Sequence, residues 1–200
     1  MRLNMSNVKI LALSGSTRNG SYNLALLRNA QLLAPKNTVI EIYQGLDKLP
    51  FYSEDLDGLR LHVEAKRLRE AIVSADGVLI ATPEYNYSLT AVLKNALDWA
   101  SRPSGRHAFV NKPSAIIGAS ASILGTVRAQ LHTRDVLHAL QADVVSRPEV
   151  LVTLAGSKFD QHGRLTDEIT KAFLQQLLDG LVAKIESQRI LAQMREEEAS

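Results

Sequence analysis

A loop rich in small hydroxyl side chains follows the first apolar segment of the chain, at residues 14–23. It contains two glycines and one arginine among serine, threonine and asparagine residues, and an amphipathic helical pattern comes next. The N–H groups of such a turn and the positive end of the helix dipole converge on one point, where a phosphate can bind. Gly15 and Gly20 have the spacing of a nucleoside-triphosphate loop, but Ser21 stands where that loop requires lysine. The dinucleotide pattern G-x-G-x-x-G is also missing, so the loop is typical of a site for a single phosphate monoester.

A second polar loop, at residues 82–90, follows a fully apolar segment and carries side chains suited to a flat ring. Tyr85, Asn86 and Tyr87 stand together there, directly after Glu84. A planar heteroaromatic ring could rest against the tyrosines and turn its polar edge toward backbone N–H groups. A tight turn whose aromatic side chains pack on the following helix is the alternative interpretation.

A third loop, at residues 118–126, consists largely of small residues. Such residues let the backbone approach a ligand closely, although a plain turn has the same composition. Taken together, the three loops predict a mononucleotide pocket, with the phosphate on the first loop and a planar ring across the other two.

Apolar segments alternate with helical patterns along the chain, which implies a parallel, doubly wound α/β sheet. The expected strands are residues 8–13, 38–42, 77–81, 113–118 and 149–154, and the expected helices are residues 24–34, 61–74, 91–100, 127–140 and 165–194. In the last two helices the residues expected to face inward are Val127, Leu131, Val136, Leu137 and Leu140, and Ile169, Phe173, Leu177, Leu181 and Ile185. Five strands with helices on both faces fit the flavodoxin-like order 2-1-3-4-5.

Ligands bind such sheets beyond the carboxyl ends of the strands, at the switch point between the first and third strands. This rule places residues 14–23 next to residues 82–90.

Length and composition predict one domain over residues 1–200, with flexible ends at about 1–7 and 190–200. The net charge of +2 and the absence of basic runs give no sign of nucleic-acid binding. With no cysteine in the chain, thiolate nucleophiles, disulfides and iron–sulfur clusters are excluded, and the five histidines lack metal-ligand spacing. The sequence shows neither a signal peptide nor a membrane span, so we expect a cytoplasmic protein.

Several groups of residues match the pattern of a known family. They are Gly15-Ser16-x-Arg18-x-x-Ser21-x-Asn23, then Pro83-Glu84-Tyr85-Asn86-x-Ser88, then Leu93-Lys94-Asn95-Ala96-Leu97-Asp98-Trp99-x-Ser101-Arg102. This combination resembles the NADPH-dependent FMN reductase family, which includes quinone, chromate and azo-dye reductases with a flavodoxin-like fold. The likeness continues at residues 125–130 and 159–167. We expect Asn95 and Trp99 to anchor their helix, with an oligomer contact as the alternative role.

The resemblance implies FMN as cofactor, NADPH or NADH as hydride donor, and a role for each matching residue. For the phosphate the implied residues are Ser16, Thr17, Arg18, Ser21 and Asn23, and for the ring and its hydrogen-bonding edge Pro83, Glu84, Tyr85, Asn86 and Tyr87. Ser120 and Gly125 would lie near the ring, and Arg128 near the cofactor and a subunit interface. The chain departs from the family at Thr90, where many relatives have proline, at residues 121–122 and at Thr126.

The implied reaction is a ping-pong transfer, in which hydride passes from NAD(P)H to flavin N5 and two electrons then reduce a small acceptor. The flavin carries this chemistry, so no catalytic side chain is expected, and Glu84 should face the ring or cap a backbone rather than act as a base. The acceptor could be a quinone, an azo compound, a metal oxyanion or free flavin, and the resemblance implies a homodimer or homotetramer. Two alternatives stay open: a flavin-binding electron carrier or redox sensor, and a reductase that supplies free reduced FMN to a partner.

Overall fold

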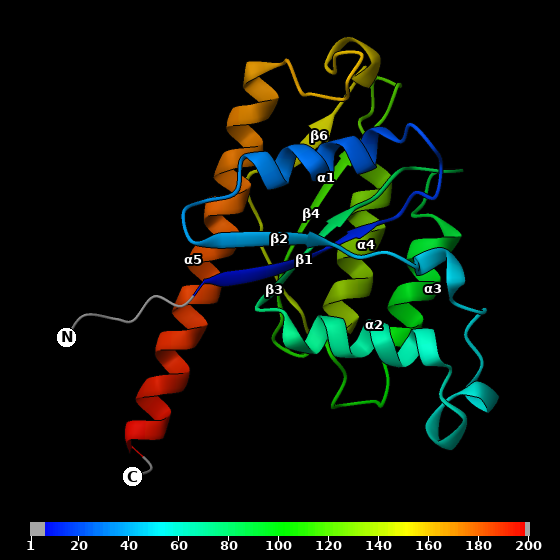
Figure 1. Cartoon of the computed structure of the whole chain (residues 1–200), viewed down its shortest axis with the longest axis vertical. Helices are drawn as coiled ribbons and strands as arrows, with labels where there is room; N and C mark the ends of the chain where they lie inside the picture. Colours follow the sequence, from blue (N-terminus) through cyan, green and yellow to red (C-terminus); the bar gives the residue numbers. More distant parts are fainter. Residues whose placement is uncertain (1–6, 199–200) are drawn as a thin grey trace.

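The computed structural model of the chain describes residues 7–198 and is built around one parallel β-sheet (Figure 1). Its strands are β1 (Val8–Ser14), β2 (Thr38–Ile42), β3 (Gly77–Ala81), β4 (Pro113–Ala119), β5 (Asp143–Val144) and β6 (Val150–Val152). They follow the order β2-β1-β3-β4-β5, and β6 pairs with β4 as well. All of these pairings are parallel, which confirms the predicted doubly wound, flavodoxin-like sheet.

The fifth position of the sheet differs from the prediction of a single strand at residues 149–154. β5 pairs with the start of β4 at Pro113 and Ser114, whereas β6 pairs with its end over residues 117–119. Pro148 lies between the two short strands and has no N–H to donate, so a continuous ladder cannot run through it. The sheet therefore has six strands in five positions.

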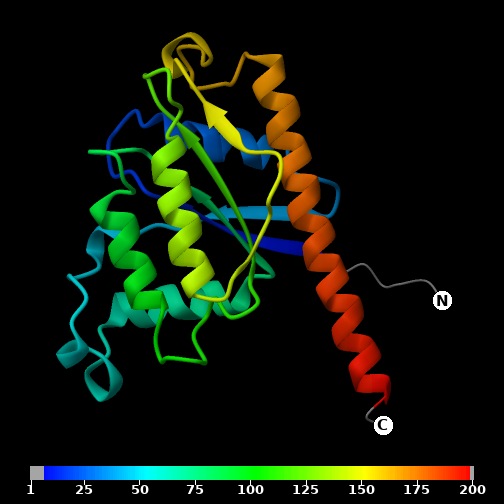
Figure 2. The same cartoon turned by 180° about the vertical axis from the view of Figure 1, so that it is seen from behind.

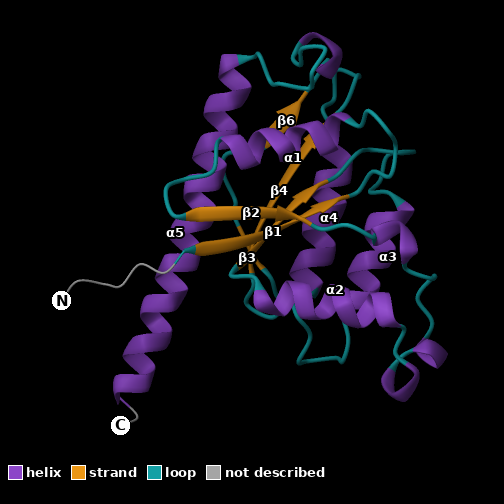
Figure 3. Ribbon diagram, in the orientation of Figure 1, coloured by secondary structure: helices purple, strands orange, loops and turns teal. Residues whose placement is uncertain are grey.

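Helices cover both faces of the sheet (Figures 2 and 3). They are α1 (Tyr22–Leu32), α2 (Val63–Ser74), α3 (Ala91–Ala100), α4 (Val127–Ala139) and α5 (Glu168–Glu198). α1 and α5 share one hydrophobic core with Ile10 and Ala12 of β1, and α2, α3 and α4 share the other with Leu11 and Leu13. Successive side chains of a buried strand point to opposite faces, which is why an uninterrupted apolar run serves both cores.

The inward faces of the last two helices agree with the prediction in part: Leu137, Leu140, Leu177, Leu181 and Ile185 are buried as predicted, whereas three other predicted residues are exposed. Leu131 in α4 is 50% exposed, and Ile169 and Phe173 in α5 are 69% and 45% exposed. The buried residues are Ala129, Gln130, Thr133 and Leu137 in α4, and Thr170, Leu174, Leu177, Leu178, Leu181 and Ile185 in α5. A strict four-residue repeat drifts around a helix of 3.6 residues per turn, so the buried face follows mixed spacings of three and four.

The ends of the chain were expected to be flexible, but α5 is helical as far as Glu198. Residues 1–6 and 199–200, the remaining part of that prediction, lie outside the described residues. Between residues 7 and 198 we find no helix long and apolar enough to cross a membrane.

The connection between β2 and α2 is anchored by α3, as predicted for Asn95 and Trp99. The Asn95 amide accepts a hydrogen bond from the N–H of Tyr52 (2.8 Å) and donates one to the carbonyl of Pro50 (2.9 Å). The indole N–H of the buried Trp99 donates to the same carbonyl at 2.8 Å. Through these contacts Asn95 and Trp99 anchor α3 to the segment that contains Pro50 and Tyr52.

An ion pair in the same region makes stability depend on pH. Arg69 donates to both carboxylate oxygens of Asp57 at 2.9 Å and to the carbonyl of Trp99 at 2.7 Å. The hydrogen bonds from Arg69 hold the pKa of Asp57 below its ordinary value. A lowered pKa in the folded state stabilises the protein above the carboxyl pKa of the unfolded chain, near 4, and this contribution is lost as the pH falls through the folded pKa.

We therefore expect Asp57→Asn to lower the urea midpoint more at about pH 7 than at about pH 3, because the contribution of the wild-type carboxylate falls as the pH falls toward its lowered pKa. Parallel urea titrations at the two pH values measure the difference. Asp55→Asn is the control, because the exposed Asp55 side chain makes no ion pair within residues 7–198. Equal losses at both pH values would contradict the role given to the ion pair.

Candidate functional site

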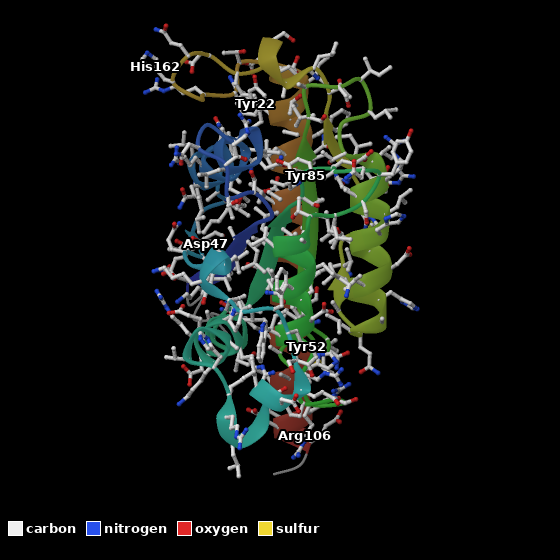
Figure 4. All side chains as sticks on the ribbon, turned by 90° about the vertical axis from the view of Figure 1, so that its right-hand side faces the viewer. Tyr22, Asp47, Tyr52, Tyr85, Arg106 and His162 are labelled. Carbon is white, nitrogen blue, oxygen red and sulfur yellow. The ribbon has the colours of Figure 1, made fainter. Side chains whose placement is uncertain are left out.

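Three loops meet at the carboxyl edge of the sheet, where the chain switches from β1 to β3. The N–H of Gly15, after β1, donates to the carbonyl of Ala81 at the end of β3 (2.8 Å). The hydroxyl of Thr90, after the second loop, donates to the carbonyl of Gly15 (2.6 Å) and caps α3 by accepting from the N–H of Leu93. Figure 4, which turns the right-hand side of Figure 1 to the viewer, shows Tyr22 and Tyr85 on this side of the molecule. The structure thus confirms that residues 14–23 and 82–90 lie side by side.

The first loop presents a set of unpaired donors. Within the described part of the chain, the N–H groups of Thr17, Asn19, Gly20 and Ser21 have no acceptor. Gly20 adopts a φ of +69°, which a residue with a side chain rarely takes, and the Ser21 hydroxyl caps α1 by accepting from the N–H of Leu24. Free N–H groups at a capped helix N-terminus are suited to an anion, so the predicted phosphate site has the donors that it requires.

Asn23, predicted to contact the phosphate, has other partners. Its side chain is 3% exposed, donates to the carbonyl of Ala119 and accepts from the N–H of Ala119, both at 2.9 Å. This reciprocal pair joins the first turn of α1 to the end of β4. The structure therefore gives Asn23 a task besides the predicted one, which is to hold the first and third loops together.

The second loop is a tight hairpin turn. Tyr85 and Ser88 exchange two backbone hydrogen bonds of 3.0 Å across it, and the central residues Asn86 and Tyr87 have φ values of +50° and +68°. Positive φ at both central positions is the geometry of a type I′ turn, which is strained for a tyrosine. The alternative interpretation is correct about the tight turn, but Tyr85 and Tyr87 are exposed, so its packing of these tyrosines on the following helix is wrong.

Glu84 caps a helix from another part of the chain, which confirms one of its two expected roles. One carboxylate oxygen accepts from the N–H groups of Arg128 (3.0 Å) and Ala129 (3.3 Å), the first residues of α4. The other accepts from Arg128 Nε at 2.6 Å and pairs with Arg128 Nη2. The cap residue of α4, Thr126, makes no side-chain cap of its own, so Glu84 supplies the negative charge favoured at a helix N-terminus. The Arg128 guanidinium also lies 3.6 Å from the centre of the Tyr87 ring.

The third loop is pinned to the end of β6. Ser120 N–H donates to the carbonyl of Val152 at 2.9 Å, and its hydroxyl accepts from the N–H of Ser122 at 3.1 Å. Gly125 was expected near the ring, but its missing side chain makes room for β6 instead. A Cβ on Gly125 would lie 3.0 Å from a backbone atom of Leu151, and its φ of +55° also favours glycine. The close approach at Gly125 that the structure shows is therefore between two parts of the chain.

Two adjoining cavities lie between these loops. The first, about 330 Å³ in volume, is lined by residues of all three loops: Ser16, Arg18, Ser21, Tyr22, Asn23, Pro83, Glu84, Tyr85, Ala119, Ser120 and Ala121. The second, about 500 Å³, is lined by Glu84, Asn86, Tyr87, Ser120, Ser122 and Arg128. Every predicted residue except Thr17 and Gly125 lines one of them. Tyr22, Ala119 and Ala121 were not predicted, although each directly neighbours a predicted residue, and neither was Ser122, two residues after Ser120.

A third cavity, about 830 Å³, opens on the other side of the first loop. Thr17 lines it, together with residues 43–47 after β2 and residues 159–163, which belong to the second half of the family pattern. The sequence assigned no function to either segment. Only the tertiary structure brings them to the first loop.

Comparison with known proteins agrees with this geometry. The model of the NADPH-dependent FMN reductase family matches residues 8–157. An NAD(P)H-dependent FMN reductase of Pseudomonas aeruginosa is 46% identical over 175 residues, covering 88% of this chain and 94% of the relative. A 2-hydroxy-1,4-benzoquinone reductase of a Burkholderia species is 39% identical, covering 92% and 99%. Among solved structures, the flavoenzyme NAD(P)H:(acceptor) oxidoreductase FerB from Paracoccus denitrificans superposes with a TM-score of 0.82 and 33% identity, over 90% of this chain and 98% of FerB.

Proposed function

Because this chain belongs to the NADPH-dependent FMN reductase family, we propose that it binds FMN across the three loops and reduces a quinone-like acceptor with NAD(P)H. It is an oxidoreductase that uses FMN as its cofactor and NAD(P)H as its electron donor. The observation that carries the assignment of the site is the row of unpaired N–H groups before α1, where Ser21 lines both the cavity that all three loops share and the larger one beside it, and Thr17, Asn19 and Gly20 line the larger one.

The donor set of the first loop fits the phosphate of FMN. A phosphate monoester can accept hydrogen bonds from the free N–H groups of residues 17 and 19–21, from the hydroxyl of Ser16 and from the guanidinium of Arg18. Thr17 and Ser21 would add hydroxyl groups to the same cradle. Asn23 holds the third loop against it without being needed as a ligand.

The ring would lie toward the second and third loops, where Pro83, Tyr85 and Ser120 line the smaller cavity. When bound there, FMN supplies the redox chemistry, because it can take up a hydride and return two electrons to an acceptor. The protein's contribution is to hold the loops rigid: Glu84 fixes the second loop to α4, and the turn at Asn86 and Tyr87 keeps both tyrosines at the open side. No side chain has to act as nucleophile or base.

We further propose a homo-oligomer, since exposed apolar side chains gather beside the site. They belong to Tyr85, Tyr87, Ile123, Leu124 and Leu131, and such surfaces are frequently covered in assemblies. Light scattering, which gives the mass of the protein in solution, tests this proposal.

The cytoplasmic location of the protein stays a prediction, and so does the choice of acceptor among a quinone, an azo compound, a metal oxyanion and free flavin.

The test of the proposed function is an anaerobic absorption spectrum of the FMN-reconstituted protein, before and after addition of NADPH. We expect the flavin band at about 450 nm to bleach and then to return when benzoquinone is added. A bound flavin that NADPH does not bleach would favour the electron carrier or sensor. Loss of FMN during gel filtration, with flavin reduction retained, would favour a reductase that releases reduced FMN. Failure to bind FMN would contradict the proposal.

Arg18→Ala should raise the dissociation constant of FMN about tenfold or more, since a hydrogen bond to a charged group contributes roughly 1.5–3 kcal/mol. The guanidinium is exposed and is steered by a 3.0 Å hydrogen bond to the carbonyl of Gly20. Fluorescence titration of the apoprotein with FMN measures the change. Arg60→Ala, an exposed arginine outside the three cavities, is the matched control, and an unchanged FMN affinity in Arg18→Ala would remove Arg18 from the phosphate site.

A further inference from the structure

The cavity of about 830 Å³ beside the first loop is much larger than one phosphate group needs. The first loop forms the floor of this cavity, and the outer walls are residues 43–47, the second turn of α1 and residues 159–163. It shares Ser16, Arg18, Ser21 and Tyr22 with the smaller cavity that we assign to FMN. An elongated ligand could therefore cross the first loop from one cavity to the other. In Figure 4, His162 and Tyr22 lie toward one end of this side of the molecule and Asp47 lies farther along it.

The outer part of this cavity holds a cation with no partner. Arg28 makes no hydrogen bond or ion pair within residues 7–198, although it lines the cavity and is exposed. It lies six residues after Tyr22, about 9 Å along the helix axis from the start of α1, where the FMN phosphate would bind. His162 lines the cavity as well, on the segment that passes over α1 at Ala25. Arg28 can receive an anion separate from the FMN phosphate, and His162, whose Nε2 lies 3.2 Å from the amide nitrogen of Gln161, has its Nδ1 left for the same anion.

Two carboxylates also line the cavity and limit where an anion can bind. Asp160 accepts from the N–H groups of His162 and Arg164, each at 2.8 Å, so one of its oxygens is engaged in holding its own turn. Asp47 lies on the opposite wall, in the segment after β2. A carboxylate there repels a phosphate but can accept hydrogen bonds from ribose hydroxyl groups. The charges thus favour a phosphate at the Arg28 side and a sugar toward Asp47.

The same cavity offers an aromatic wall. The rings of Tyr22 and Phe159 stack with their centres 5.7 Å apart and their planes at 27°, and both residues line the cavity. A purine base can stack on such a pair, and the amides of Gln44 and Gln161 can bind its polar edge. Aromatic wall, amides and unpaired arginine together suit a purine nucleotide that carries a phosphate.

We propose that this cavity binds the adenosine 2′-phosphate end of NADPH, with the 2′-phosphate on Arg28 and His162. The proposal rests on the proposed function, since the nicotinamide must reach the ring across the first loop. It makes Arg28 a specificity residue for NADPH over NADH, because only NADPH carries the 2′-phosphate. An arginine that receives this phosphate is a recurring solution in other nucleotide-binding folds.

Arg28→Gln in the FMN-loaded protein tests the proposal. The KM for NADPH should rise about tenfold, the effect of losing one charge-assisted hydrogen bond, while the KM for NADH and the dissociation constant of FMN stay within about twofold. Calorimetric titration gives a second readout that needs no turnover: 2′,5′-ADP should bind the wild type more tightly than 5′-AMP does, and Arg28→Gln should abolish the difference. Arg28→Lys should recover part of it, and Arg60→Gln should behave as the wild type.

Equal changes in KM for NADPH and NADH would overturn the proposal, as would equal binding of 2′,5′-ADP and 5′-AMP by the wild type. A loss of FMN affinity in Arg28→Gln would also overturn it, because Arg28 would then belong to the FMN phosphate. If the wild type failed to bind FMN, the proposed function would fail, whereas the titration with 2′,5′-ADP would still decide this inference independently.

Discussion

Gly118→Ala should lower the free energy of unfolding by about 3 kcal/mol, in the upper part of the range for overpacked interiors. Gly118 lies in β4, just before the third loop, and any Cβ there would be 1.9 Å from Thr126 Oγ1 and 2.7 Å from the carbonyl oxygen of Thr82. The carbonyl belongs to rigid backbone, so the strand or the loop must move. Thr126 and the neighbouring Gln130 position the start of α4, and FMN affinity should fall with stability. Urea unfolding of the apoprotein and fluorescence titration with FMN measure the two effects.

Two further variants separate overpacking from a general effect of alanine. Gly180→Ala, in the middle of α5, would meet only an ordinary contact of 3.6 Å with Val145, and alanine favours a helix, so stability should hold or rise. In the double variant Gly118→Ala with Thr126→Gly, removal of the clashing hydroxyl should recover part of the lost free energy of unfolding. The recovery should be partial because the clash with the Thr82 carbonyl remains. A Gly118→Ala protein that unfolds at the wild-type urea concentration would show that this interpretation is wrong.

Glu84→Gln should destabilise the protein by about 2 kcal/mol, although the two side chains have the same shape. One carboxylate oxygen accepts hydrogen bonds from the N–H groups of Arg128 and Ala129, and the other accepts from the Arg128 guanidinium. Glutamine has a single acceptor oxygen, so its NH₂ group must face one of these donors and leave it unpaired. Leaving donors unpaired around a nearly buried group costs roughly 1–3 kcal/mol. The start of α4 also loses its favourable charge.

Thermal and urea unfolding measure this loss, and Glu149→Gln is the matched control. Glu149 pairs with Arg147 at 3.1 Å, but Arg147 is 80% exposed, and a surface pair of this kind contributes less than about 1 kcal/mol. We expect the second loop to be mobilised in Glu84→Gln, which should appear as faster amide exchange at residues 84–88. Equal stability losses in the two variants would contradict the capping role of Glu84.

Much of the fold and the type of site followed from local patterns in the sequence. Apolar runs predicted the first, third and fourth strands and a shorter segment at residues 38–42 predicted the second, and their alternation with helical spacing implied a parallel sheet in the observed order. Parallel strands end at the same edge, so loops after the first, third and fourth strands had to meet there. The small hydroxyl residues of the first loop predicted a phosphate cradle, because backbone N–H groups at a helix N-terminus are unpaired whatever the rest of the chain does.

The partners of individual side chains depended instead on packing between segments far apart in the chain. Glu84 caps a helix that begins more than forty residues later, and Asn23 bonds the backbone of Ala119, 96 residues away. Neither pairing can be read from the periodicity or the composition of the sequence, because a carboxylate or an amide side chain can bind many different partners. The cavity that joins Arg28 to residues 43–47 and 159–163 has the same origin. Short-range patterns specify which backbone groups are free, whereas the identity of a distant partner is set only when the helices pack on the sheet.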